Sequence, residues 1–163
     1  MDLQKGKEIF FRYYGSSFYI DSECGDEYRK CNVPRDVEKA WSKEIKHNLI
    51  CRIKITSGAE RIKFVNLYIQ LLDCTDSVNF LISMLREYRM DTFSSILLAE
   101  SLKTLAEKCQ DTETKNTALS ELKSIKIRLK SEKPTVDSSY TEPDYMKDYD
   151  FSEEAVLKRI DRL

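Results

Sequence analysis

Apolar residues recur every three or four positions from Ser57 to Leu129, and the interruptions between these runs are short and polar. This spacing places apolar side chains on one side of an α-helix. Residues that favour helix starts, such as Ser57, Asp91 and Asp111, stand at the interruptions. The pattern predicts four consecutive helices, over residues 60–72, 77–88, 91–109 and 111–130.

The helix starts in this stretch recur at a nearly constant interval. Ser57 and Asp91 are 34 positions apart, and Asp76 and Asp111 are 35 apart. Matched helix–turn–helix units are typical of a helical-repeat stack, although an ordinary antiparallel bundle would show the same spacing. Ser57 and Glu60 also have capping-box spacing, so we expect each side chain to bond a free amide at this helix start.

Three parts follow one another between Val78 and Ile125: a helix ending in a short polar turn, an Ala/Leu-rich second helix, and an acidic turn that opens the next unit. In this order of parts the stretch resembles HEAT-type α-solenoid repeats. The family's frequent proline in the first helix is absent, and Thr92-Phe93 stands where the family often has Val-Arg. The resemblance covers less than half of the chain. It implies a curved stack that binds a partner on its concave side, and it carries over no catalytic residue.

In the N-terminal third of the chain, the patterns that predict secondary structure are less regular. Leu3–Tyr14 is predicted to be a helix that Gly15 ends, with a β-hairpin over IFFRYY-GSS-FYI as the alternative. Residues 18–32 are predicted to be irregular, with one helical turn over 27–31, and their aromatic residues Phe18, Tyr19 and Tyr28 are expected to pack against the body of the protein. Pro34 then opens a long helix to about Ile55, because apolar residues recur every four positions along it. These residues are Val37, Trp41, Ile45, Leu49 and Ile53.

The composition of the chain changes from residue 132 onward. Residues 132–150 contain two prolines, an acidic excess and no aliphatic periodicity, which predicts a flexible acidic linker. A short helix over 151–163, capped by Asp150 or Ser152, follows this linker. It either docks on the body of the protein or enters a groove of a partner.

The predicted fold class is therefore all-α, with antiparallel helical hairpins stacked as a small α-solenoid-like or irregular helical bundle. We expect one helical domain over residues 1–131. Its predicted parts are an N-terminal helix and loop (1–33), a long helix (34–56) and two helical hairpins (57–131).

The composition indicates the class of protein, its partners and its location. Hydrophobic residues make up 41% and charged residues 34% of the chain, as in a charged-surface helical protein. The net charge of −1 disfavours nucleic acid as a partner. The five cysteines lack the paired spacing of a zinc ribbon or a disulfide framework, so reduced thiols are expected. With no signal sequence and no membrane-spanning apolar stretch, the predicted location is cytoplasmic.

The residues do not form a recognisable catalytic motif. The single histidine, His47, lies four positions before Cys51, so a Cys–His dyad is conceivable on one helix face. No orienting Asn or Asp is identifiable, and a packed cysteine beside a histidine is the simpler interpretation. Glycine motifs for phosphate and ligand sets for metal are absent from the sequence. We predict no enzyme activity, no cofactor and no metal.

Basic residues concentrate in the segments 35–54 and 113–130, and tyrosines lie among acids in the tail. If the two basic helix faces adjoin, they would hold a phosphate backbone or the acidic tail itself, while solvated helix faces are the simpler interpretation. The tail tyrosines have the context of a recognition or phosphorylation segment. The candidate partner-binding residues are Lys43, Lys46, Lys123, Lys126, Arg128, Tyr140, Tyr145 and Tyr149.

These observations predict a non-catalytic protein–protein interaction module. Small regulators, adaptors and toxin-immunity-type proteins are examples of this class, and the partner would be another protein. The alternative is a HEAT-like protein that binds nucleic acid through basic helix faces. A homodimer is a further prediction, because the helix over 60–72 is apolar on two sides.

Overall fold

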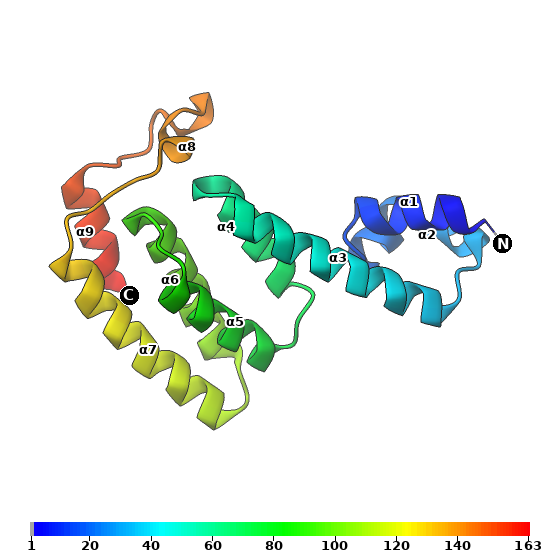
Figure 1. Cartoon of the computed structure of the whole chain (residues 1–163), viewed down its shortest axis with the longest axis horizontal. Coiled ribbons are helices and arrows are strands. Elements are labelled where there is room, and N and C mark those ends of the chain that lie inside the picture. The colour runs from blue at the N-terminus through cyan, green and yellow to red at the C-terminus, as the bar shows by residue number, and fades with distance from the viewer. Residues whose placement is uncertain (1) are drawn as a thin grey trace. The chain divides into compact units, whose positions relative to one another are not determined.

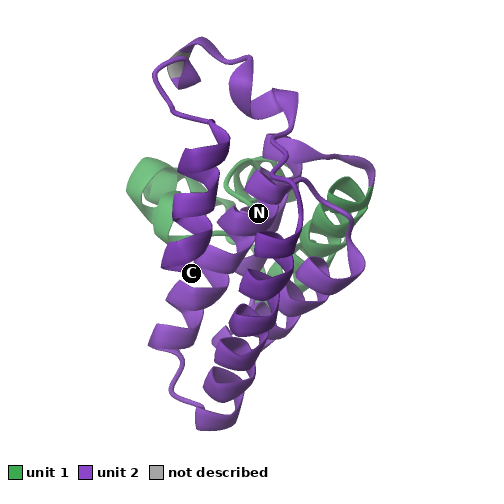
Figure 2. Ribbon diagram, turned by 90° about the vertical axis from the view of Figure 1, so that its left-hand side faces the viewer, with its two compact units in different colours: residues 1–54 green, residues 55–163 purple. Residues whose placement is uncertain are grey.

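The structure is a computed structural model that describes residues 2–163, apart from the side chain of Tyr145. Within this range the chain is all-α, as predicted, and its regular elements are α-helices and one short 3-10 helix (Figure 1). The chain divides into two units, residues 1–54 and residues 55–163 (Figure 2). This division differs from the predicted single domain over 1–131, and it includes the tail in the second unit.

The first unit contains α1 (Leu3–Arg12), α2 (Ser17–Cys31) and most of α3 (Arg35–Ile55). Asp2 caps α1, since its side chain accepts a hydrogen bond from the Lys5 amide at 3.0 Å. The buried Phe10 of α1 meets Trp41 of α3 with ring centroids 5.6 Å apart. The long helix over 34–56 and the core position of Trp41 are confirmed.

Gly15 lies in the turn that follows α1, close to the predicted end of this helix, with φ of +71°. Its amide donates to the Phe10 carbonyl at 2.8 Å, and a Cβ at this position would press against the Phe10 ring. The turn therefore needs glycine for both its backbone angle and its close approach. The alternative β-hairpin over this region is wrong, because both of its proposed strands are helical.

The prediction of an irregular segment over 18–32 is also wrong, because α2 occupies it. The helix is interrupted at Cys24, whose φ of −153° is not helical. Only Ile20, Gly25 and Cys31 of α2 are buried, and Phe18 and Tyr19 are exposed. This kinked helix with few buried side chains lacks the apolar period from which a helix is predicted.

The second unit is built around three helices, with α6 packed between α5 and α7 (Figure 1). Its core consists of apolar side chains from these helices, among them Leu81, Ile96, Leu98 and Ala118, which are fully enclosed. The helices of this unit are α4 (Gly58–Ile69), α5 (Cys74–Glu87), α6 (Thr92–Lys108), α7 (Thr112–Ser131), α8 (Ser138–Thr141) and α9 (Glu153–Arg162).

The N-caps of this unit agree with the sequence prediction for α6 and α7 and differ from it for α4 and α5. Asp91 and Asp111 cap α6 and α7 as predicted, accepting from the Ser94 and Thr114 amides at 2.9 and 2.8 Å. However, α5 begins three residues earlier than predicted, because Asp73 rather than Asp76 is its cap. The Ser57 side chain makes no cap hydrogen bond, so the predicted capping box at α4 is wrong.

The tail from residue 132 onward follows the body of the second unit and does not behave as the predicted free linker. It contains α8 and a 3-10 turn at Asp144–Met146. Thr135 and Thr92 exchange hydrogen bonds: the Thr135 amide donates to Thr92 Oγ1 at 2.9 Å, and the Thr92 amide donates to Thr135 Oγ1 at 3.1 Å. The Phe93 amide donates to the Thr135 carbonyl at 3.1 Å.

The C-terminal helix α9 docks on the protein itself, the first of the two predicted outcomes. It packs against α6 and α7, where Val156 and Ile160 are buried. Ser152 caps it by accepting from the Ala155 amide at 3.3 Å. None of the helices in the part of the chain described has the length and apolarity needed to cross a membrane.

Candidate functional site

The predicted tail residue Tyr140 is part of the core rather than a free recognition element. Its side chain is 6% exposed, and its hydroxyl lies 3.0 Å from Ser94 Oγ in α6. The Tyr140 ring meets Phe93 edge-on with centroids 4.9 Å apart. Burial raises the pKa of Tyr140 to about 12, with a smaller contribution from the nearby Asp91.

Tyr149 contacts the same region from the partly exposed surface. Its hydroxyl accepts a hydrogen bond from Arg159 at 2.6 Å, and its ring packs on Phe151 with centroids 4.8 Å apart. Arg159 also donates twice to Glu100, at 3.0 and 2.6 Å, and lies over the Phe93 ring. The side chain of Tyr145, the third predicted tyrosine, lies outside the described residues.

The predicted basic residues of α7 are largely occupied by the chain itself. Lys126 donates to the Asp161 carbonyl at 2.6 Å, and Arg128 donates to the Leu85 carbonyl at 3.0 Å. Lys123 is exposed. The partner of Lys126 belongs to the C-terminal helix α9 and not to the acidic segment 132–150, so this contact is not the predicted cover of a basic groove by that segment. Lys43 and Lys46 belong to the other unit, on α3.

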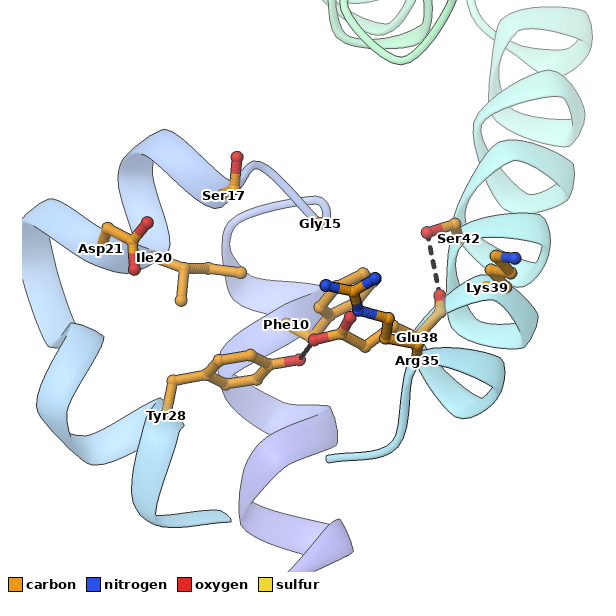
Figure 3. A pocket seen from close by; sticks show the side chains of 10 residues that line it. All are labelled: Phe10, Gly15, Ser17, Ile20, Asp21, Tyr28, Arg35, Glu38, Lys39 and Ser42. Atoms are coloured by element: carbon orange, nitrogen blue, oxygen red, sulfur yellow. Dashed lines mark hydrogen bonds between the residues drawn. The ribbon is translucent and has the colours of Figure 1, made fainter. Parts of the chain in front are cut away.

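The first unit contains a hollow of about 430 Å³ between its three helices. Figure 3 shows Ile20 and Tyr28 of α2 facing residues of α3, with Phe10 of α1 between them. Apolar groups therefore form one side of the hollow, and charged groups lie at its rim. The rim residues are Asp21, Arg35, Glu38 and Lys39.

One hydrogen bond fixes the polar side of this hollow. The Tyr28 hydroxyl donates to Glu38 Oε1 at 2.8 Å (Figure 3). Burial, and then the hydrogen bond and charge of Glu38, raise the pKa of Tyr28 well above its usual value. The phenol stays protonated at neutral pH and holds the carboxylate in place, so α2 and α3 are tied together across the hollow.

Two aromatic side chains are exposed on the first turn of α2. Phe18 is 73% exposed and Tyr19 is 51% exposed, and their rings contact each other edge-on with centroids 5.3 Å apart. They lie between Ser17 and Ile20 in sequence, and these two residues line the hollow. Exposed aromatic side chains close to each other are typical of interaction surfaces.

A basic row leads away from the hollow along α3. Arg35, Lys39, Lys43 and Lys46 are spaced by four, four and three positions, so they lie on one side of the helix. Arg35 and Lys39 line the hollow, and all four except the half-buried Lys46 are exposed. We call these four residues the basic stripe. The predicted residues Lys43 and Lys46 belong to this stripe, on the same helix as Arg35 and Lys39 of the hollow.

Phe18 and Tyr19 are exposed, so the prediction that they pack against the body of the protein is wrong. Exposure of an aromatic side chain leaves no local trace in a sequence, because the same residue type fills protein cores. The one feature of the sequence that indicates their exposure is that Phe18 and Tyr19 lie outside any run of regularly spaced apolar residues.

The conceivable Cys–His dyad is present as a contact, with Cys51 Sγ 3.7 Å from His47 Nε2. Both residues are exposed on α3, where water surrounds the thiol. Reactive thiols of enzymes lie in clefts with a partner that orients the base. Among the described residues, no group of three or more His, Cys, Asp or Glu side chains is arranged to hold a metal ion.

Comparison of the chain with protein-family models, with curated proteins and with solved structures gives no match.

Proposed function

We propose that the protein is a non-catalytic binding protein whose first unit holds another protein. The observation that carries this proposal is the exposed Phe18–Tyr19 pair on α2, the helix that also forms one wall of the 430 Å³ hollow. Aromatic residues are enriched at the centres of protein interfaces, where their burial supplies much of the binding energy. The hollow has the size for a large apolar side chain of the partner.

The charge of this surface indicates the chemistry of the partner. The basic stripe continues from the rim of the hollow along α3, so an acidic segment next to the apolar anchor would face it. Such complementarity mainly speeds association and selects among partners. We therefore propose an acidic protein surface with one protruding apolar residue as the partner. Cysteines without disulfide spacing support a cytosolic setting.

The experiment compares the wild type with two variants of this surface, Phe18→Ser/Tyr19→Ser and Lys39→Glu/Lys43→Glu. Each is immobilised and exposed to lysate of its source cell, and the captured protein is identified, purified and titrated. The expected result is a one-to-one complex whose Kd rises at least tenfold in the aromatic variant. The charge variant should slow association and remove most of the salt dependence.

The matched control is Ile127→Ser on α7, an apolar residue that is 70% exposed in the second unit. This variant should bind like the wild type. Equal binding by all variants, or failure to recover any protein at one-to-one stoichiometry, would overturn the proposal. Recovery of a toxin-like partner would assign the protein to the immunity class, and recovery of a second copy would assign it to homodimers.

The nucleic-acid alternative has less support than the protein-binding proposal. Two of the basic residues it requires, Lys126 and Arg128, are bonded to backbone carbonyls of this chain. The HEAT-like arrangement remains a proposal for the hairpins of the second unit.

A further inference from the structure

Two cysteines of the second unit lie at the same end of the α5–α6 hairpin. Cys74 is the first residue of α5 and Cys109 follows the last residue of α6, and these two helices pack together. Because consecutive helices joined by a short turn run antiparallel, the start of the first meets the end of the second. Residues 35 positions apart in sequence are thereby brought together.

The contacts around Cys109 bring its backbone next to the Cys74 thiol. The Cys74 thiol donates to the Leu105 carbonyl at 3.6 Å, and the Cys109 amide donates to the same oxygen at 2.9 Å. On the other side of Cys109, Thr114 Oγ1 lies 3.4 Å from Thr75 Oγ1. The chain on both sides of Cys109 therefore contacts residues 74 and 75. Burial, and then a hydrogen bond with the Cys109 thiol, raise the pKa of Cys74.

We propose that Cys74 and Cys109 are an oxidation site that forms a disulfide with a peroxide as the oxidant. The thiolate of one cysteine attacks a peroxide oxygen, which leaves a sulfenic acid and one water after protonation. The second sulfur then attacks the sulfenic sulfur, the S–S bond forms, and a second water leaves. The two sulfurs together lose two electrons and two protons, and one hydrogen peroxide becomes two waters.

The disulfide would join the N-terminus of α5 to the C-terminus of α6. Such a bond restricts the unfolded chain between the two cysteines, so the oxidised protein should unfold at higher temperature. Where Cys74 is the attacking thiol, its raised pKa slows the reaction at neutral pH, because the thiolate is the nucleophile.

The experiment treats the full chain with hydrogen peroxide after reduction and maps disulfides by non-reducing peptide mass spectrometry. The expected result is one intramolecular link between the peptides of Cys74 and Cys109, with free thiols falling from the five of the reduced chain to three. Oxidation should raise Tm by several degrees, and dithiothreitol should reverse the rise.

Variants separate this site from other thiols. Cys74→Ser and Cys109→Ser should each abolish both the link and the rise in Tm. The control Cys51→Ser removes the exposed thiol and should keep both. Links through Cys51, dimers between chains, or oxygen addition without a Cys74–Cys109 link would each overturn the proposal.

Discussion

Ser139 Oγ accepts a hydrogen bond from the Ala59 amide at 2.9 Å, which joins two residues 80 positions apart. This contact supplies the cap of α4 that the Ser57 side chain does not provide. The first amides of a helix have no partner within the helix, so a hydroxyl from elsewhere in the fold can satisfy one of them. The tail is thereby part of the structure of α4.

Replacement of Gly58 should disturb this junction. Gly58 has φ of +50°, and a Cβ there would collide with Ser139 Oγ and Asp137 Oδ1. We expect Gly58→Ala to destabilise the protein by about 2 kcal/mol or more in urea unfolding, through strain and displacement of the tail. Ser139→Ala should cost about 1 kcal/mol as a lost cap.

Gly25→Ala is the control for this prediction. A Cβ at Gly25 meets only the flexible end of Arg29, at 3.2 Å, so this change should have little effect. Equal destabilisation by both glycine variants would contradict the assigned role of Gly58.

Tyr140 should make the protein sensitive to alkaline pH. The pKa of Tyr140 is raised to about 12 in the fold, against about 10 when unfolded. The unfolded chain therefore loses this proton first, and stability that is fully present below pH 10 is lost as the pH rises toward 12. Over this range we expect the wild type to lose about 2 kcal/mol more than Tyr140→Phe, because Tyr28, whose pKa is also raised, is present in both proteins.

Chemical unfolding at pH 8 and pH 11.5 measures this difference. At pH 8, Tyr140→Phe should cost about 1 kcal/mol for the hydrogen bond with Ser94. The same alkaline loss in both proteins would show that Tyr140 is not buried as described.

Arg159 should hold the tail and α9 on α6. It donates two hydrogen bonds to Glu100 and one to Tyr149. Arg159→Ala should cost about 1–3 kcal/mol and speed tryptic cleavage after Lys147, because cleavage of a docked segment requires local opening. The control is Glu27→Gln, which removes an exposed ion pair with Lys5 in the first unit and should change neither quantity measurably. Unchanged cleavage in Arg159→Ala would mean that other contacts hold the tail.

Asp137 should add an acid-dependent component to tail docking. Hydrogen bonds from Ser139 hold the pKa of Asp137 below its usual value. Its contribution is present above the unfolded pKa of about 4 and is lost as the pH falls through the lower folded value. Asp137→Asn keeps an acceptor without the charge, so tail cleavage by pepsin should depend less on pH between 4 and 2.5 than in the wild type. An unchanged profile would exclude Asp137 as the titrating group.

The parts of the fold predicted from sequence are those that local rules determine. Asp91 and Asp111 were recognised as caps because each bonds an amide three residues ahead, and Trp41 was recognised as core because its neighbours repeat every four residues. The docked tail was missed because its anchors are distant in sequence. Thr135 needs Thr92, and Tyr140 needs Ser94.

The candidate site was predicted only in part, for a related reason. Lys43 and Lys46 were identified from charge, which is visible in any sequence. The hollow is lined by Phe10, Ile20 and Glu38, which come from three different helices. A local sequence pattern does not predict which residues of different helices come together. Lys126 and Arg128 show the opposite error, since charge alone does not reveal that a side chain bonds its own fold.

The central claim, that the surface around Phe18 binds another protein, is tested most directly by photo-crosslinking in the source cell. A benzophenone amino acid replaces Phe18 in one variant and Ile127, which is also exposed, in a second. We predict one discrete adduct with a single acidic protein from position 18, and none from position 127. No adduct from position 18, an adduct with a second copy of the chain, or the same adducts from both positions would contradict the claim.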